Sequence, residues 1–189
     1  EDDHASLIVD GVILEVECAT LTGTPIVVDY TENYSSIQVN PNRFIIGLTG
    51  NATAVTKATV TISNISSQDL LTFTPTTATG NIAASFSSSG NTAGTLTLTS
   101  ATNLATIAQW EAALNSVKFS NSSENPVTSP RSVAFVVFDT NNNNSASAQI
   151  TSTVNVISVN DQPTISALPS FSITEDTVGN LQFTGTPFA

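Results

Sequence analysis

The stretch ITSTVNVISVNDQP (150–163) has the pattern of a long apolar strand that stops at an Asn-Asp-Gln-Pro segment. Behind it, Thr-Glu-Asp (174–176) and Leu-Gln-Phe (181–183) repeat Thr-Glu-Asn (31–33) and Ile-Gln-Val (37–39), which occur earlier in the same order. Recurrence of this kind is typical of modules in a tandem array. The sequence therefore predicts one whole module between the two copies of this repeated pattern and the start of another module after it.

The composition favours a β-sandwich. Hydrophobic residues make up 40% of the 189, only 10% are charged, and Thr, Ser and Asn supply most of the polar surface. Outward positions of strands accept such small hydroxyl and amide side chains. Fifteen acidic and four basic residues give a formal net charge of −11. This charge argues against nucleic acid and anionic membranes as partners and permits divalent cations, although acidity can also serve only to keep an all-β protein soluble.

Short runs of strand-forming residues follow one another along the chain. They lie at 26–30, 37–39, 57–63, 70–73, 82–86, 95–99, 132–138 and 149–159. Gly80, Gly90 and Gly94, among Ser and Asn residues, mark the predicted turns. The run 132–138 is apolar on both faces and is predicted to be a central strand. About eight strands at short spacing predict a sandwich.

An N-terminal hairpin is predicted in front of this series. Apolar runs at 6–9 and 12–16 flank Asp10-Gly11, a pair that readily forms a two-residue hairpin turn. Cys18 is the only cysteine, so the chain can form no internal disulfide, and its place in the apolar alternation predicts a buried small hydrophobe. We interpret residues 1–24 as an extension to the module.

One helix is predicted at 103–117. Ile107, Trp110, Leu114 and Val117 recur there at helical spacing, and Asn103 is the expected N-cap. Trp110 is expected to close one end of the sandwich core.

Five motifs in order carry a family likeness. They are DLLTF (69–73), GTLTLT (94–99), WEAALNSVKF (110–119), RSVAFVVFD (131–139) and VNDQP (159–163). Together they resemble the cadherin-like tandem repeats of very large bacterial surface proteins and adhesins. The resemblance covers residues 25–161, and residues 162–189 look like a linker and the first strand of a following repeat.

The resemblance implies a cadherin- or immunoglobulin-like Greek-key sandwich in a long extracellular array, with calcium at the junctions between repeats. By position, Glu32 looks like the acid near the end of the first strand, and Asp139 like the acid after the penultimate strand. Asn160 and Asp161 look like the linker ligands. Carboxylate and amide oxygens are the ligands that calcium takes in proteins.

The region 42–57 departs from the family pattern. Repeats of this family carry an acidic loop soon after the first strand, whereas this region has no acid and contains Arg43 and Lys57. Either a basic side chain stands where an ion would lie, or the ion is lost. The run 44–48 has the pattern of a strand that packs against another element, for which the N-terminal hairpin is a candidate.

Catalytic motifs are not found in the sequence. His4 is the only histidine, which leaves no set of residues for a Ser-His or Cys-His nucleophile or for a Cys/His zinc site. We therefore interpret the chain as a non-catalytic extracellular module with a structural or adhesive role, in contact with neighbouring repeats. The alternative is a filament or surface-layer subunit, in which the segment 162–189 is a donor strand that adds to the sheet of another copy.

Overall fold

The computed structural model describes residues 19–49, 52–101, 104–140 and 146–162, together with the backbone of 6–9 and 12–15. The chain divides into two compact units, Glu1–Val159 and Asn160–Ala189. All the described strands and helices belong to the first unit. The linker and strand predicted at 162–189 lie outside the described residues, apart from Gln162.

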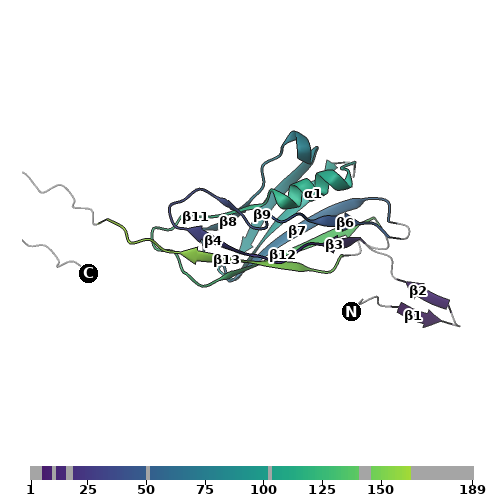
Figure 1. The fold of residues 1–189 in the computed structure, drawn as a ribbon, viewed down its shortest axis with the longest axis horizontal. Helices are drawn as coiled ribbons and strands as arrows, with labels where there is room; N and C mark the ends of the chain where they lie inside the picture. The colour runs from purple at the N-terminus through teal and green to yellow at the C-terminus, as the bar shows by residue number, and fades with distance from the viewer. Residues whose placement is uncertain are drawn as a thin grey trace, which may run out of the picture. The chain divides into compact units, whose positions relative to one another are not determined.

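A six-stranded sheet forms the larger layer of the module (Figure 1). Its order is β4-β13-β12-β7-β10-β9, with neighbours antiparallel except for β4 and β13, which run parallel. The strands are β4 (Val27–Thr31), β7 (Val55–Ser63), β9 (Ile82–Ser89), β10 (Ala93–Ser100), β12 (Arg131–Asp139) and β13 (Ile150–Ile157). The central place of β12 confirms the prediction made from its apolar faces.

A smaller layer covers one face of this sheet. It contains a three-stranded sheet, β5-β11-β8, and the only α-helix of the described residues, α1, which lies across the module from β13 in Figure 1. The elements are β5 (Ile37–Gln38), β8 (Asp69–Thr72), the 3₁₀ turn η1 (Thr77–Thr79), α1 (Ile107–Asn115) and β11 (Lys118–Asn121). The module is thus an all-β sandwich with one short helix, as the sequence predicts.

The core lies between the two layers and follows the strand alternation of the sequence. Ala58, Val60 and Ile62 of β7 are fully buried, and so is every second residue of β12 from Val133 to Val137. Trp110 of α1 is also fully buried, which confirms its predicted place in the core. Side chains that alternate along a strand point to opposite faces of the sheet, so this pattern fixes which face is covered.

Two local predictions were wrong. Helix α1 begins at Ile107 with Thr106 as its N-cap, because the Thr106 hydroxyl accepts the Gln109 backbone N–H at 3.3 Å; the predicted N-cap, Asn103, lies outside the described residues. Gly94 is a residue of β10 and not of a turn. A Cβ at Gly94 would lie 2.5 Å from Cζ of Phe86, so glycine leaves room for this ring.

The N-terminal part contributes two strand pairs. β1 (Ser6–Val9) and β2 (Val12–Glu15) form the predicted antiparallel hairpin, while Asp10, Gly11 and Cys18 lie outside the described residues. β3 (Thr20–Thr22) pairs with β6 (Ile45–Gly47). Ala19 and Leu21 belong to the hydrophobic core. The sandwich therefore includes residues from 19 onward, whereas the sequence places its boundary at 25.

Candidate metal centre

The parallel pairing of β4 and β13 brings two chain segments to the same end of the module. Thr31, the last residue of β4, lies opposite Ile157, the last residue of β13. The next residue of the first segment, Glu32, donates its backbone N–H to the Ile157 carbonyl at 2.9 Å. The end of β4 and the end of β13 therefore meet at Glu32.

The carboxylate of Glu32 is buried, and one of its oxygens has no hydrogen-bond partner among the residues that the structure describes. Glu32 is 2% exposed. Its Oε2 accepts the backbone N–H of Val159 at 2.7 Å, whereas Oε1 has no hydrogen bond within the described part of the chain. A buried carboxylate oxygen without a donor is unfavourable, so such groups are normally paired with a donor or bound to a metal ion.

A second carboxylate approaches from the loop that follows β11. Glu124 is exposed, and its Oε2 accepts the side-chain N–H of Asn33 at 3.4 Å. Two tight turns shape this loop: Asn121 Oδ1 accepts the Ser123 N–H at 2.8 Å, and Ser123 Oγ accepts the Asn125 N–H at 3.1 Å. These turns and the Asn33 contact direct Glu124 toward the end of β4.

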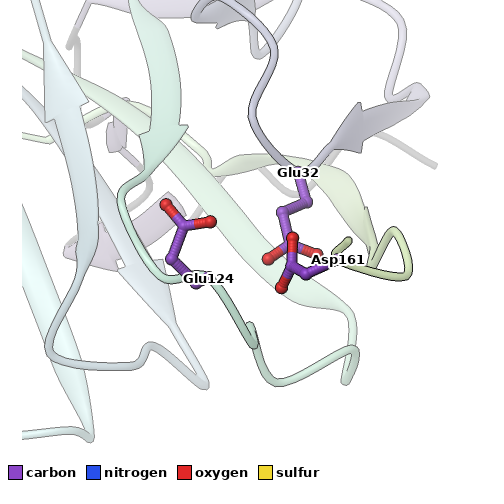
Figure 2. Close-up of side chains that lie close together, drawn as sticks. All are labelled: Glu32, Glu124 and Asp161. Atoms are coloured by element: carbon purple, nitrogen blue, oxygen red, sulfur yellow. The ribbon is translucent and has the colours of Figure 1, made fainter. Parts of the chain in front are cut away.

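A third carboxylate belongs to Asp161, two residues after Val159. Two residues of chain keep the Asp161 backbone within about 7 Å of Val159. Val159 is itself bound to Glu32, so the Asp161 backbone stays near Glu32. Carboxylate oxygens of Glu32, Glu124 and Asp161 lie within 4.8 Å of one another (Figure 2). Calcium binds oxygens at about 2.3–2.6 Å, so one ion can touch oxygens that are about 5 Å apart.

Among the described residues, no ion pair joins a basic side chain to this cluster of carboxylates. Three of the four have partners elsewhere: Arg43 lies 3.8 Å from Glu111, Arg131 pairs with Asp69, and Lys57 lies over the ring of Phe138. Three carboxylates that gather without a basic partner repel one another, and a bound cation would relieve this repulsion.

The structure brings two of the four predicted ligands into this cluster and places Asp139 elsewhere. β12 and β13 are antiparallel, so their last residues lie at opposite ends of the sheet. Asp139 is fully buried at the far end, where its Oδ2 accepts the Ala19 backbone N–H at 2.5 Å. Glu32 and Asp161 lie in the cluster, and Asn160, between Val159 and Asp161, donates its side-chain N–H to the Asp161 carbonyl at 3.3 Å.

Glu124 is the ligand candidate that sequence reasoning missed. It is the only charged residue between Lys118 and Arg131, in a loop of Ser, Asn and Pro residues. A lone acid in such a loop was a signal, but its position beside Glu32 depends on how β11 packs in the second layer.

The acid-free region 42–57 is held by helix α1. Asn115 Oδ1 accepts the Phe44 N–H at 3.2 Å, and Glu111 Oε1 accepts the Ile46 N–H at 3.0 Å. Arg43 has an exposed side chain near Glu111. The run 44–48 thus packs against β3 and α1.

No family model matches the chain, and no curated protein matches it. Two solved structures share part of its architecture. One is a cohesin module from a Clostridium perfringens ATCC13124 family 33 glycoside hydrolase, with 12% identity, a TM-score of 0.43, and coverage of 76% of this chain and 98% of that module. The other is a non-cellulosomal cohesin from the hyperthermophilic archaeon Archaeoglobus fulgidus, with 15% identity, a TM-score of 0.39, and coverage of 74% of this chain and 91% of that chain. At these TM-scores the likeness has no bearing on function. Separately, no helix of the described residues is long and apolar enough to cross a membrane.

Proposed function

We propose that this chain is a non-catalytic β-sandwich module of an extracellular surface protein, with a structural or adhesive role, and that it binds calcium where β4 and β13 end. The supporting observation is the buried carboxylate of Glu32, whose Oε1 has no hydrogen-bond partner among the described residues and which lies close to the carboxylates of Glu124 and Asp161. The cadherin-like motifs of the sequence support the placement in a tandem array on a cell surface.

The donor set favours calcium over other divalent ions. All three side chains offer carboxylate oxygens, whereas protein zinc sites are built mainly from Cys and His. Magnesium requires a nearly ideal octahedron at about 2.0–2.1 Å, while calcium accepts irregular sets of six to eight oxygens. Carboxylates from three separate segments form such an irregular set, and backbone carbonyls and water would complete it.

The ion would act as a clamp on the chain that leaves the sandwich. Glu32 follows the first strand of the six-stranded sheet, Glu124 lies in a loop of the smaller layer, and Asp161 follows the last strand. A cation bound to all three would tie these three chain segments together. Repeated at each junction, such clamps would make a string of modules stiff.

The second function considered from the sequence is a filament subunit built by strand addition. That proposal depends on residues 162–189 as a donor strand, and all of them except Gln162 lie outside the described part of the chain. Neighbouring repeats therefore remain the proposed partners of the module, in the same chain.

The experiment is a calcium titration of the 189-residue chain by isothermal calorimetry and thermal unfolding. We expect binding heat and a rise in Tm with calcium, and a much smaller rise with magnesium. Glu32→Gln and Glu124→Gln should each weaken calcium binding at least about tenfold. The matched control is Asp29→Asn, which makes the same charge change at an exposed β4 residue bonded to Asn155.

Two results would reject the calcium site. One is the absence of any heat or Tm change with calcium in the unaltered chain. The other is a calcium affinity of Glu32→Gln equal to that of Asp29→Asn.

A further inference from the structure

One edge of the six-stranded sheet is formed by β9. Among the described strands, β9 pairs only with β10, in an unbroken register from Ser100↔Ile82 to Ala93↔Ser89. Its outer backbone groups are therefore free of described strand partners. An edge strand of eight residues is a template on which another strand can pair.

Three of the usual protections of an edge strand are missing from β9. Its sequence, IAASFSSS (82–89), contains no charge and no proline, and its pairing with β10 has no bulge. Natural edges are normally blocked by such features. The opposite edge of the sheet differs, since β4 has five residues, carries Asp29 and is followed at once by Glu32.

β9 also lies within the longest uncharged stretch of the chain. From Leu70 to Trp110 there is no Asp, Glu, Lys, Arg or His, although the chain has fifteen acids and four bases. Two copies with a net charge of −11 each repel one another. The repulsion is weakest when they approach through this uncharged region. The distribution of charge therefore favours pairing of this edge with the same uncharged edge of a second copy.

We propose that β9 pairs edge to edge with β9 of a second copy, antiparallel and across a two-fold axis near Ser85. The two six-stranded sheets then form one continuous sheet. In this register Ser85 lies opposite its own copy, and Ala83 lies opposite Ser87 on the same outer face. Ala84 lies opposite Phe86 on the inner face, since their β10 partners Leu98 and Leu96 are buried.

This contact is closed, because the same strand is used by both copies. It forms a dimer and not a filament, and it does not involve the ends of the chain. A single pair of strands buries less than the roughly 1,000 Å² of a stable interface, so the dimer is weak. It should strengthen with salt, which screens the repulsion between the two acidic copies.

The test is sedimentation and light scattering of the 189-residue chain in EDTA, from micromolar to millimolar concentration, at low and high salt. We expect the mass to rise from 19.6 kDa toward that of a dimer, more so at high salt. Ser85→Glu and Ser85→Lys should each weaken dimerisation at least about tenfold, because like charges would then face each other across the axis. Thr97→Glu and Thr97→Lys are the matched controls: Thr97 is the β10 partner of Ser85 on the same face, but it lies inside the sheet.

Disulfide cross-linking tests the contact directly. Ser85→Cys in a Cys18→Ser background should form a disulfide-linked dimer under mild oxidation, whereas Thr97→Cys in the same background should not. The proposal is overturned if the unaltered chain stays monomeric at millimolar concentration in high salt. It is equally overturned if the chain associates but the Ser85 and Thr97 variants behave alike, since the copies then meet through another segment. Circular dichroism establishes that each variant is folded.

Discussion

The carboxylate of Glu32 holds the backbone of Val159 through a 2.7 Å hydrogen bond from the Val159 N–H to Oε2. The same carboxylate lies close to those of Glu124 and Asp161, and its Oε1 has no hydrogen-bond partner among the described residues. The structural role of Glu32 and the ion binding proposed for it can be separated by substitution.

Glu32→Ala should destabilise the module without calcium, because the Val159 N–H then loses its acceptor. The loss of a partly buried hydrogen bond lowers the free energy of unfolding by about 1–3 kcal/mol. Glu32→Gln keeps an acceptor oxygen, so it should change this free energy by less than about 1 kcal/mol. Urea unfolding in EDTA measures both values. Equal effects of the two variants would show that the hydrogen bond to Val159 does not hold this end of the sandwich.

Asp139→Asn should leave the calcium response unchanged, because Asp139 lies at the opposite end of the sheet from Glu32. Asp139→Ala should nevertheless lower the free energy of unfolding by about 1–3 kcal/mol, since the buried Ala19 N–H loses an acceptor. Calcium titration and urea unfolding of the two variants check these results. A calcium affinity that falls in Asp139→Asn would return this residue to the list of ligands.

The strands of the fold were predictable because their alternation is local. Ala58, Val60 and Ile62 alternate with polar residues, and burial of one face follows from that alone. The start of α1 was not predictable in this way, because the choice of Thr106 over Asn103 as N-cap depends on the reciprocal hydrogen bonds between Thr106 and Gln109. Strand β3 was not predicted, because it is only three residues long and its position depends on pairing with β6.

The candidate site was half predictable. Acids that follow strands were recognised, but the direction of each strand decides at which end its last residue lies. β12 precedes β13 as an antiparallel neighbour, so Asp139 and Ile157, at which these strands end, had to lie at opposite ends of the sheet. Glu124 reaches Glu32 only through the packing of β11 against β5 and β8, which sequence periodicity does not reveal.

Asp69→Ala should destabilise the module strongly, because it leaves the buried Arg131 guanidinium without its counter-charge. The Nε of Arg131 lies 2.9 Å from Oδ2 of Asp69, and both side chains are fully buried. Removal of one partner from such a pair lowers the free energy of unfolding by about 3–5 kcal/mol. Urea unfolding measures the change.

Replacement of both charged partners tests the same pair by another route. Asp69→Leu with Arg131→Met should be less destabilising than Asp69→Ala alone, since no buried charge is left unpaired. Asp69 also accepts the Ser66 N–H and the Asn121 side-chain N–H, so the double variant should not reach the stability of the unaltered chain. A double variant less stable than Asp69→Ala would contradict this account.

Trp110→Ala should remove the largest fully buried side chain of the described core. The resulting cavity lowers the free energy of unfolding by about 3–5 kcal/mol. Trp110→Phe isolates the contribution of volume, because the indole Nε1 has no hydrogen-bond partner in the described structure and its loss breaks no bond. We therefore expect Trp110→Phe to be less than half as destabilising as Trp110→Ala in urea unfolding. A change below about 1 kcal/mol for Trp110→Ala would contradict the buried position of this side chain. Equal losses of unfolding free energy in the two variants would show that Nε1 is hydrogen-bonded in solution.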